Sequence, residues 1–285
     1  MSIIKTEHLT HIYSQGTPYE RAALQDFNIE IEEGEFAGII GHTGSGKSTF
    51  IQHLNGLLAP TEGKVYIDGE DLWADKKDLR RFRFKVGLVF QYPEYQLFEE
   101  TVYRDIAFGP KNMGLNEQEV DEHVRFGAKF AGVDESLFEA SPLDLSGGQK
   151  RRIAIAGVMA MKPEVLVLDE PTAGLDPKGR DDILDQIAYL HKQSDMTVIL
   201  VSHSMEDIAR YADRIIVMNK GSVMYNGAPK EVFAHYQELE KIGLAAPQVT
   251  YIMHDLKEKG LPVKVNVTTV EEAADEIMQA LEKKI

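Results

Sequence analysis

The chain has 285 residues, enough to bury a large core, and its 46 acidic and 31 basic residues give a formal net charge of −15. This acidic balance disfavours general binding to nucleic acid, because phosphate contacts need clustered lysine and arginine. The absence of cysteine excludes disulfides, thiolate metal sites and a cysteine nucleophile. No apolar run approaches the ~20 residues of a membrane-spanning helix, and the N-terminus lacks a signal-peptide pattern. We therefore expect a soluble protein that reaches a membrane only through a partner.

The first third of the chain is dominated by strand patterns. Alternating apolar residues predict half-buried strands over 3–13 and 24–31, and the apolar run Phe36–Ile40 predicts a buried strand. Further strands are expected over 63–69 and 86–90. Together these segments predict an antiparallel β part followed by the first strands of a core sheet.

Helices and strands alternate in the rest of the chain. Apolar residues at helical spacing from 101 to 142 predict a helical insertion between two strands of the main sheet. The remaining expected elements are a helix at 146–161, a strand at 165–168, a helix at 178–193, a strand at 197–201, a hairpin at 214–225 and helices at 247–259 and 270–284. This order predicts an α/β fold with parallel core strands and a small helical C-terminal extension.

The segment Gly41–Thr49 carries the complete phosphate-binding pattern G-x-x-x-x-G-K-[ST], between a predicted strand and a helix start. Its glycines allow backbone N–H groups to turn around a polyphosphate, and the helix N-terminus adds positive potential. Lys47 is expected to reach the β- and γ-phosphates, and the Ser48 hydroxyl can ligate Mg²⁺. The predicted nucleotide-binding residues of this loop are Gly41, His42, Thr43, Gly44, Ser45, Gly46, Lys47, Ser48 and Thr49.

Two acids end the predicted strand at 165–168. Asp169 is expected to hold Mg²⁺ opposite the phosphate loop, and Glu170, one residue further, is the candidate base for the attacking water. The alternative is a strand that simply ends in solvated acids.

A second anion site is suggested by Ser146, Gly147, Gly148 and Gln149, which open a predicted helix. The alternative is an N-cap serine followed by flexible glycines.

About residues 2–235 resemble the ATP-binding cassette (ABC) family. Five motifs carry the resemblance, in this order: the phosphate loop, Gln91, Leu145–Gln149, Asp169–Pro171 and His203. The resemblance implies a P-loop ABC ATPase core with a mixed sheet. It also implies a nucleotide-binding domain at 1–235, a helical subdomain inserted at about 92–160 and an extension at 236–285.

In this family two cassettes pair head to tail. The resemblance implies that the phosphate loop of one and residues 146–149 of the other close on the same ATP, with Asp176 at the seam of the dimer. Gln91 would be a catalytic residue and Mg²⁺ ligand that links the metal and the attacking water to the helical insertion.

The resemblance also assigns the remaining contacts with the nucleotide. His203 would hydrogen-bond the γ-phosphate and Glu170. Tyr13 would stack on adenine, with Tyr19 as a possible substitute.

The segment Tyr92–Pro110 resembles the ATPases of energy-coupling factor (ECF) vitamin transporters and their cobalt and nickel relatives. In such transporters two ATPases, often different, dock under a membrane scaffold that also holds a substrate-capturing component. We expect the scaffold to dock near Tyr92–Glu100, with apolar contacts from Tyr92, Tyr95, Leu97 and Phe98 and with Glu94, Glu99 and Glu100 facing its arginines. The alternative is that the aromatics pack internally and the acids are solvated.

The tail is a second point of resemblance to the ECF ATPases. Residues 246–250 and 260–262 are similar to their C-terminal extension, which contributes to contact between the two ATPases; the alternative is a helical cover on the core. The residues at Thr43 and Lys150–Arg152 resemble the second of the two ECF ATPase paralogues more than the first.

The sequence therefore predicts an ATP-hydrolysing subunit, peripheral on the cytoplasmic face of the membrane, that energises an importer of vitamins or similar micronutrients. The nearest alternative is the ATPase of a cobalt or nickel importer. A soluble ABC protein acting in translation or DNA repair and a regulatory ATP-binding module are further alternatives. Pairing with a different ATPase and pairing with a second copy both stay open.

Overall fold

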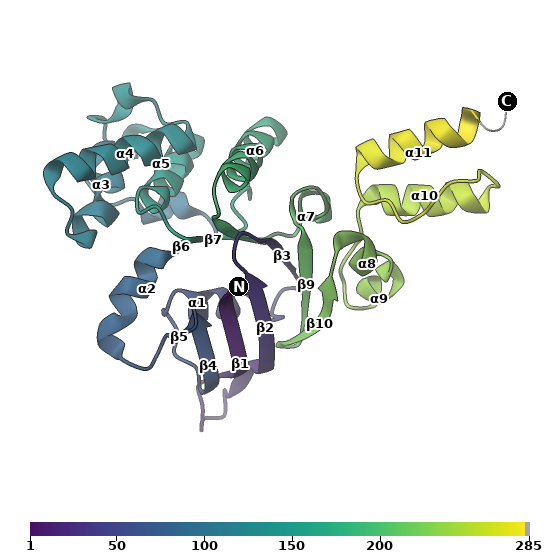
Figure 1. Cartoon of the computed structure of the whole chain (residues 1–285), viewed down its shortest axis with the longest axis horizontal. Coiled ribbons are helices and arrows are strands. Elements are labelled where there is room, and N and C mark those ends of the chain that lie inside the picture. The colour runs from purple at the N-terminus through teal and green to yellow at the C-terminus, as the bar shows by residue number, and fades with distance from the viewer. Residues whose placement is uncertain (283–285) are drawn as a thin grey trace.

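The computed structural model describes residues 1–282, and its strands form two sheets (Figure 1). The four-stranded antiparallel sheet has the order β2-β1-β4-β5, with β1 at Ser2–Tyr13, β2 at Arg21–Glu32, β4 at Glu62–Ile67 and β5 at Glu70–Asp71. The six-stranded sheet has the order β10-β9-β3-β8-β7-β6, with β3 at Phe36–Ile40, β6 at Val86–Val89, β7 at Val165–Asp169, β8 at Thr197–Val201, β9 at Arg214–Asn219 and β10 at Ser222–Gly227. Only β10 runs antiparallel to its neighbour in this sheet.

The central strands β3, β7 and β8 are buried along their whole length. Continuous apolar runs are typical of parallel strands that are covered on both faces. Because these strands pair in parallel, their carboxyl ends meet at the same edge of the sheet. The predicted α/β fold is confirmed.

Helix α1, Lys47–Leu54, lies in the core between the two sheets. Phe50, Ile51 and Leu54 are fully buried, and the ring of Phe50 lies 4.7 Å from that of Phe27 on β2. Burying a large apolar side chain contributes roughly 1.5–3 kcal/mol, so these contacts hold the helix firmly behind the loop that precedes it.

The predicted helical insertion is the group of α3, Val102–Met113, α4, Glu117–Ala131, and α5, Gly147–Met159, at the upper left of Figure 1. A Cβ atom at Gly127 would lie 2.3 Å from the carbonyl oxygen of Ala156, so α4 and α5 approach closely at this glycine. A capping box between Asn116 and Glu119 starts α4.

Helices α2, α7, α8 and α9 have no counterpart among the predicted elements. Each has seven residues or fewer, and α2 buries only Phe82 among its side chains, so the sequence offers no apolar stripe at helical spacing. The remaining helices are α2 at Leu79–Lys85, α6 at Pro177–Gln193, α7 at Met205–Tyr211, α8 at Pro229–Phe233 and α9 at Tyr236–Lys241, with short 3₁₀ turns η1 at Lys76–Asp78, η2 at Pro93–Gln96, η3 at Glu135–Leu137 and η4 at Pro142–Asp144.

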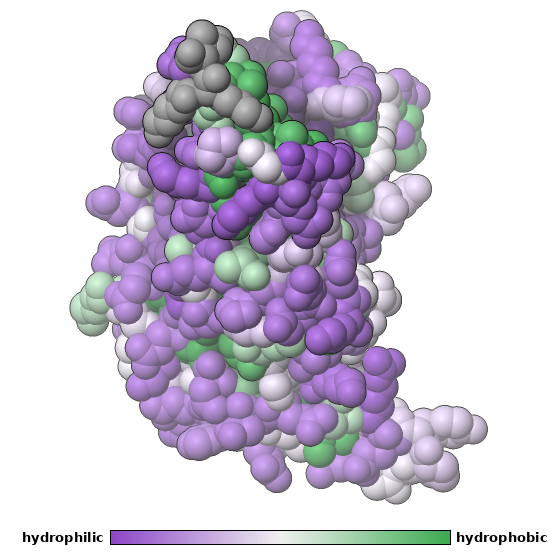
Figure 2. All heavy atoms as spheres, turned by 90° about the vertical axis from the view of Figure 1, so that its right-hand side faces the viewer, coloured by the Kyte–Doolittle hydropathy of each residue, from purple (hydrophilic) through white to green (hydrophobic). Residues whose placement is uncertain are grey.

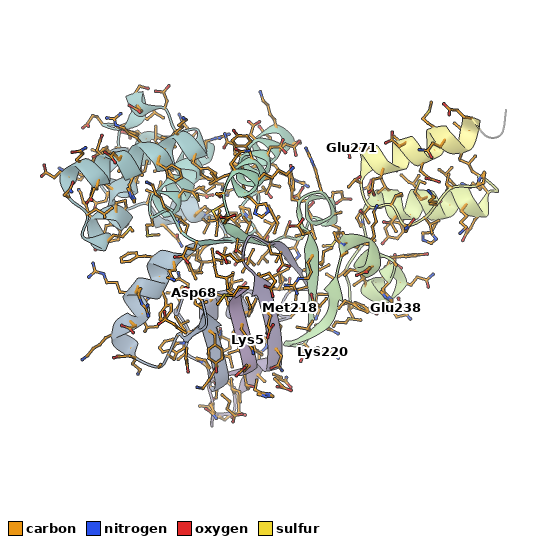
Figure 3. All side chains as sticks on the ribbon, viewed as in Figure 1. Lys5, Asp68, Met218, Lys220, Glu238 and Glu271 are labelled. Carbon is orange, nitrogen blue, oxygen red and sulfur yellow. The ribbon has the colours of Figure 1, made fainter. Side chains whose placement is uncertain are left out.

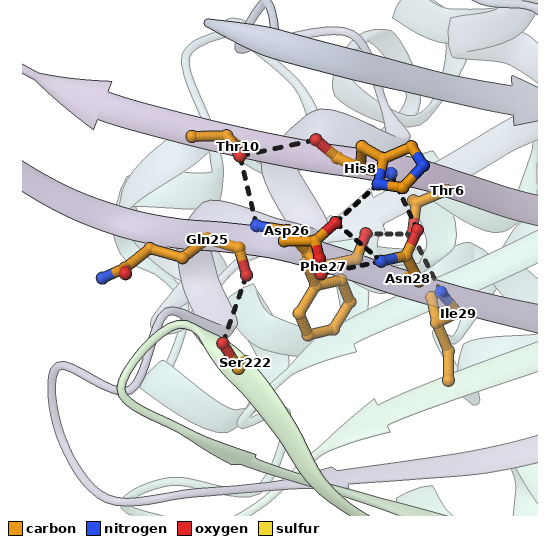
Figure 4. A network of polar contacts seen from close by, with 9 residues as sticks. All are labelled: Thr6, His8, Thr10, Gln25, Asp26, Phe27, Asn28, Ile29 and Ser222. Atoms are coloured by element: carbon orange, nitrogen blue, oxygen red, sulfur yellow. Dashed lines mark hydrogen bonds and ion pairs between the residues drawn. The ribbon is translucent and has the colours of Figure 1, made fainter.

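Polar contacts tie the antiparallel sheet to the hairpin of the larger sheet (Figure 4). Asp26, which has a positive φ of 46°, accepts hydrogen bonds from Asn28 at 3.0 Å and pairs with His8 at 2.7 Å. From β10, the Ser222 hydroxyl donates to the carbonyl of Gln25 at 3.2 Å. The first two contacts lie within the antiparallel sheet, where β1 and β2 pair with register shifts, and the third joins β2 to β10.

The C-terminal helices α10, Gln248–Glu258, and α11, Val270–Glu282, enclose a small apolar cluster of their own. Glu271, labelled in Figure 3, marks the start of α11, and the next residue, Glu272, pairs with Lys230 of α8 at 2.6 Å. By contrast, Leu239 of α9 packs into the main core. Residues 283 and 284 of the predicted last helix lie outside the described residues.

Some apolar side chains of this extension remain on the surface. Ile252, Val270, Met278 and Leu281 are exposed, and Figure 2 shows apolar patches on the otherwise hydrophilic face at this end of the molecule. Within residues 1–282, no helix has both the length and the apolar character to cross a membrane.

Candidate functional site

A cavity of about 390 Å³ opens beside the carboxyl edge of the six-stranded sheet. The loop after β3 supplies one wall, and the residues that follow β6, β7 and β8 supply the other. The lining residues are Thr43, Gly44, Gly46, Lys47, Ser48, Thr49, Gln91, Glu170 and His203. The structure thus places nine of the predicted site residues around one cavity: six of the phosphate loop, together with Gln91, Glu170 and His203.

The glycines of the loop serve two different needs. Gly44 and Gly46 have φ angles of 82° and 105°, which residues with a Cβ adopt only with strain. Gly41 lacks a positive φ, but a Cβ there would lie 2.4 Å from the Ser45 hydroxyl oxygen and 2.5 Å from the carbonyl oxygen of Met218. The backbone conformation therefore requires glycine at positions 44 and 46, and the lack of space for a Cβ requires it at position 41.

Lys47 lies across the loop from which it projects. Its ammonium group donates to the carbonyl of Gly41 at 2.5 Å and to that of His42 at 3.3 Å. Burial lowers its pKa, and the negative charges of Glu170 and Asp169 oppose that change. The two carboxylates favour the charged form of Lys47, whose ammonium group can then attract a phosphate group.

Asp169 ends β7 and is buried beside Lys47. Burial, followed by the charge of Glu170, raises the pKa of its carboxyl group, whereas Lys47 and a hydrogen bond from Ser48 act in the opposite direction. A buried carboxylate next to a serine hydroxyl is the oxygen donor set that Mg²⁺ prefers. The residues present therefore fit this metal.

Glu170 follows directly, and its backbone has a positive φ of 50°. One carboxylate oxygen lies 2.8 Å from Nε2 of His203, and the other accepts a hydrogen bond from Nε2 of Gln91 at 3.1 Å. A non-glycine residue in this conformation costs roughly 1–3 kcal/mol, a strain that is often found at functional sites. Two side chains, one from the end of each strand that flanks β7, thus fix the orientation of this carboxylate.

The candidate adenine contact is placed beside the loop. The Tyr13 hydroxyl shares a hydrogen bond of 3.2 Å with the Thr49 hydroxyl, and the ring is 40% exposed. Tyr19 is 85% exposed. The structure therefore favours Tyr13 over Tyr19 as the aromatic neighbour of the loop.

Residues 146–149 lie outside the set that lines the cavity, on the exposed start of α5. Ser146 and Gln149 form a capping box, in which the Gln149 N–H donates to the serine oxygen at 3.3 Å and the Ser146 N–H to the glutamine side chain at 3.0 Å. Asp176 is also exposed and caps α6 by accepting from the Gly179 N–H at 2.7 Å. Within this chain both motifs therefore have local capping roles.

Glu94 corrects one sequence-based expectation. We expected it to pair with arginines of a partner, but it forms a two-pronged ion pair with Arg151 of the same chain, at 2.8 and 3.1 Å. The sequence does not reveal this contact, because no local pattern connects two residues that lie 57 positions apart.

A second contact that the sequence did not reveal lies behind Tyr13. The rings of Tyr13, His11 and His53 are in consecutive edge-to-face contact, with centroids 4.5 and 4.8 Å apart. His53 is fully buried on α1 and donates from Nδ1 to the Thr49 carbonyl at 2.7 Å. Burial lowers its pKa from 6.5 to about 4, so the ring is neutral near pH 7.

The site combines a phosphate loop, a buried Asp169 beside Ser48, and a Glu170 carboxylate that His203 and Gln91 orient. These features define a class of protein, the nucleoside-triphosphatases of the P-loop type, here with an inserted helical subdomain. The model of the family described as ABC transporter matches residues 24–173.

Curated relatives and solved structures agree with this class. The chain is 56% identical to the energy-coupling factor transporter ATP-binding protein EcfA2 of Clostridium tetani, over 99% of the chain and 98% of the relative. It is 57% identical to EcfA2 of Clostridium acetobutylicum, over 98% of each. The structure of cbiO1 from Clostridium perfringens, part of the ABC transporter complex cbiONQ, superposes with a TM-score of 0.74 at 40% identity, covering 89% of this chain and 99% of that one.

A more distant match is the dimeric ATP-binding cassette MJ0796 in a post-hydrolysis state with ADP and Pi. Its TM-score is 0.72 at 32% identity, covering 79% of this chain and 98% of that one. The chain belongs to the ABC transporter family and, within it, to the ATP-binding proteins of energy-coupling factor transporters, in the group of the second paralogue. The sequence-based assignment to this family is confirmed, and the chain is an ATPase.

The buried histidine behind Tyr13 generates a prediction about stability. Because the pKa of His53 is lower in the folded chain than in the unfolded chain, the unfolded state binds more protons below pH 6.5. The free energy of unfolding should therefore fall by about 3 kcal/mol from this residue as the pH drops from 7 through 4. Urea unfolding measured across this pH range should show that the free energy of unfolding depends less on pH in His53→Gln than in the wild type.

The control replaces an exposed residue that carries no titratable group. Gln118→Ala on α4 should leave the slope of stability against pH as in the wild type. Equal slopes for wild type and His53→Gln would contradict a neutral buried His53.

Proposed function

We propose that this chain binds and hydrolyses ATP to energise a membrane importer of vitamins or similar micronutrients. The observation that carries the catalytic part is the Glu170 carboxylate, held by His203 and Gln91 in the cavity that Lys47 also lines. The micronutrient and the importer come from membership of the energy-coupling factor family.

The residues divide the chemistry among them. The N–H groups of the loop and Lys47 bind the β- and γ-phosphates. Glu170 accepts a hydrogen bond from the attacking water and orients it, and His203 holds Glu170 in place and contacts the γ-phosphate. Asp169 and Ser48, with Gln91, would hold Mg²⁺, which supplies positive charge to the phosphates when it is bound.

The site is completed by a second cassette. Residues 146–149 are exposed at a helix start but lie outside the lining of this chain's own cavity, as expected for an anion site that serves a partner. The proposed partner is a different ATPase of the same family, and a second copy is the alternative. Asp176 would lie at the seam, and Tyr13 would stack on adenine.

The membrane scaffold is proposed to dock at Tyr92–Glu100, where aromatic side chains are exposed. Tyr95 is 84% and Phe98 64% exposed, and the ring of Phe98 meets that of Phe108 edge to face at 4.9 Å. Phe108, Gln96 and Leu97 also line a groove of about 270 Å³ between η2, α3 and α5. An apolar groove beside acidic Glu99 suits one helix of the scaffold that carries arginine.

This arrangement gives the chain a peripheral position on the cytoplasmic face of the membrane. The substrate-binding component would contact it only indirectly, through the scaffold. We propose residues 1–235 as the nucleotide-binding domain, with the helical subdomain at about 92–160, and 236–285 as an extension that contacts the second ATPase. A cobalt or nickel importer would use the same cavity residues.

Replacing the candidate base tests its role. Glu170→Gln keeps the size of the side chain but removes its charge, so ATP affinity should be retained while turnover falls by about a hundredfold or more. Equilibrium ATP binding and phosphate release measure the two effects. Glu258→Gln, an exposed change on α10, is the control, and normal turnover in Glu170→Gln would exclude it as the base.

Dilution tests whether the site is shared between cassettes. A lone chain supplies half of the contacts around the γ-phosphate, so the rate per chain should rise with protein concentration and reach a plateau as cassettes pair. Steady-state ATPase assays over a wide concentration range measure this rate. A high rate that stays constant down to dilute monomer would refute the shared site.

Charge reversal tests the docking surface. Because Glu94 pairs within the chain, the informative change is Glu99→Arg combined with Tyr95→Ala. This double variant should still bind ATP but lose the membrane scaffold in a detergent pull-down. Glu122→Arg, exposed on α4, is the control, and intact assembly of the double variant would count against this surface.

A further inference from the structure

A buried arginine links three parts of the chain that the ATPase reaction uses separately. Arg151 lies on α5, the helix that Ser146 caps, and is only 3% exposed. Its Nε and Nη2 donate to the two carboxylate oxygens of Glu94 at 3.1 and 2.8 Å. Its Nη1 donates to the carbonyl of Ala173 at 2.5 Å. All three nitrogens of the guanidinium group are thus engaged.

Both partners of this arginine lie close in sequence to the catalytic carboxylate or its contacts. The Ala173 N–H donates to the carbonyl of Glu170 at 3.2 Å, so Ala173 closes the turn that begins at Glu170. Glu94 lies in η2, just after Gln91, whose side chain donates to the Glu170 carboxylate at 3.1 Å. The contacts therefore form a closed ring from Gln91 through Glu170, Ala173 and Arg151 to Glu94 and back along the chain.

We propose that Arg151 is a positioning residue that couples the segment Tyr92–Phe98 to the Glu170 turn and to the start of α5. This route is distinct from the direct contact of Gln91 with Glu170. A displacement of η2 moves Glu94, and the planar guanidinium group transmits the movement to Ala173 and to its own helix. The coupling to a docked partner rests on the proposed function, whereas the link to Glu170 concerns this chain alone.

The chemistry of the contact explains why a lysine would not serve. A lysine could neutralise Glu94, but its compact ammonium group cannot form the two-pronged pair and reach Ala173 in fixed geometry. A residue that merely neutralises this partly buried carboxylate would tolerate the change. Arg151→Lys therefore separates positioning from simple charge balance.

The first experiment uses the full chain without partners. Hydrogen exchange should be about tenfold faster in residues 170–176 of Arg151→Lys, while the melting temperature stays near that of the wild type. Arg125→Lys is the matched control, because Arg125 forms ion pairs with Asp121 and Glu135 within the helical subdomain, away from both loops. Wild-type exchange over 170–176 in Arg151→Lys would overturn the proposal.

The second experiment measures kinetics at protein concentrations where the rate per chain has reached its plateau. Arg151→Lys should lower kcat about tenfold with the KM for ATP within about twofold, because phosphate binding is left intact while Glu170 is less well oriented. Glu94→Gln, which weakens the other half of the link, should lower kcat in the same direction. An unchanged kcat, or a rise in KM alone, in both variants would overturn the proposal.

The third experiment addresses the partner. In the complex co-purified with its membrane subunits, Glu94→Gln should reduce the stimulation of ATPase activity by those subunits about fivefold or more, with assembly retained. Full stimulation would overturn the coupling role. Failure of the wild-type chain to assemble would instead contradict the proposed function, and the exchange and kinetic results would still decide the link to Glu170.

Discussion

The parallel pairing of β3, β8, β7 and β6 is the constraint on which the site depends. Because the four strands run in one direction, the residues that follow them meet at one edge. The phosphate loop, His203, Asp169 with Glu170, and Gln91 come from segments far apart in the chain, yet they surround one cavity. Their distances are set by the spacing of strands that are buried along their whole length, and the reactive groups are therefore positioned by the buried centre of the sheet.

The helical subdomain provides exposed surface, which the buried strands of the sheet do not. It presents residues 146–149 and the aromatic segment that begins at Tyr92 on exposed surface, and it joins both to the sheet through Arg151 and Gln91. A movement of this subdomain therefore reaches the Glu170 carboxylate along two routes. The same geometry explains why Glu94 is unsuited to a partner's arginine, since its two oxygens are already paired.

Much of this arrangement can be predicted from the sequence. Buried parallel strands are continuous apolar runs, and the phosphate loop is a contiguous pattern with a defined context, so Gly41–Thr49, Asp169 and Glu170 are located by local chemistry. The pairing of Glu94 with Arg151 and the edge-to-face contact of His11 with His53 depend on tertiary structure and have no local signal. Short helices such as α2 were missed because they bury almost no periodic face.

The position of α1 between the two sheets has a thermodynamic consequence. Its N-terminus faces the cavity, its apolar face joins β2 to the core sheet, and Thr49 at its start contacts Tyr13 of β1. A nucleotide that binds to the folded chain alone raises its unfolding free energy in proportion to the logarithm of ligand concentration. Since the helix is shared, that gain would extend to both sheets at once, and the nucleotide level of the cell would set the stability of the whole cassette.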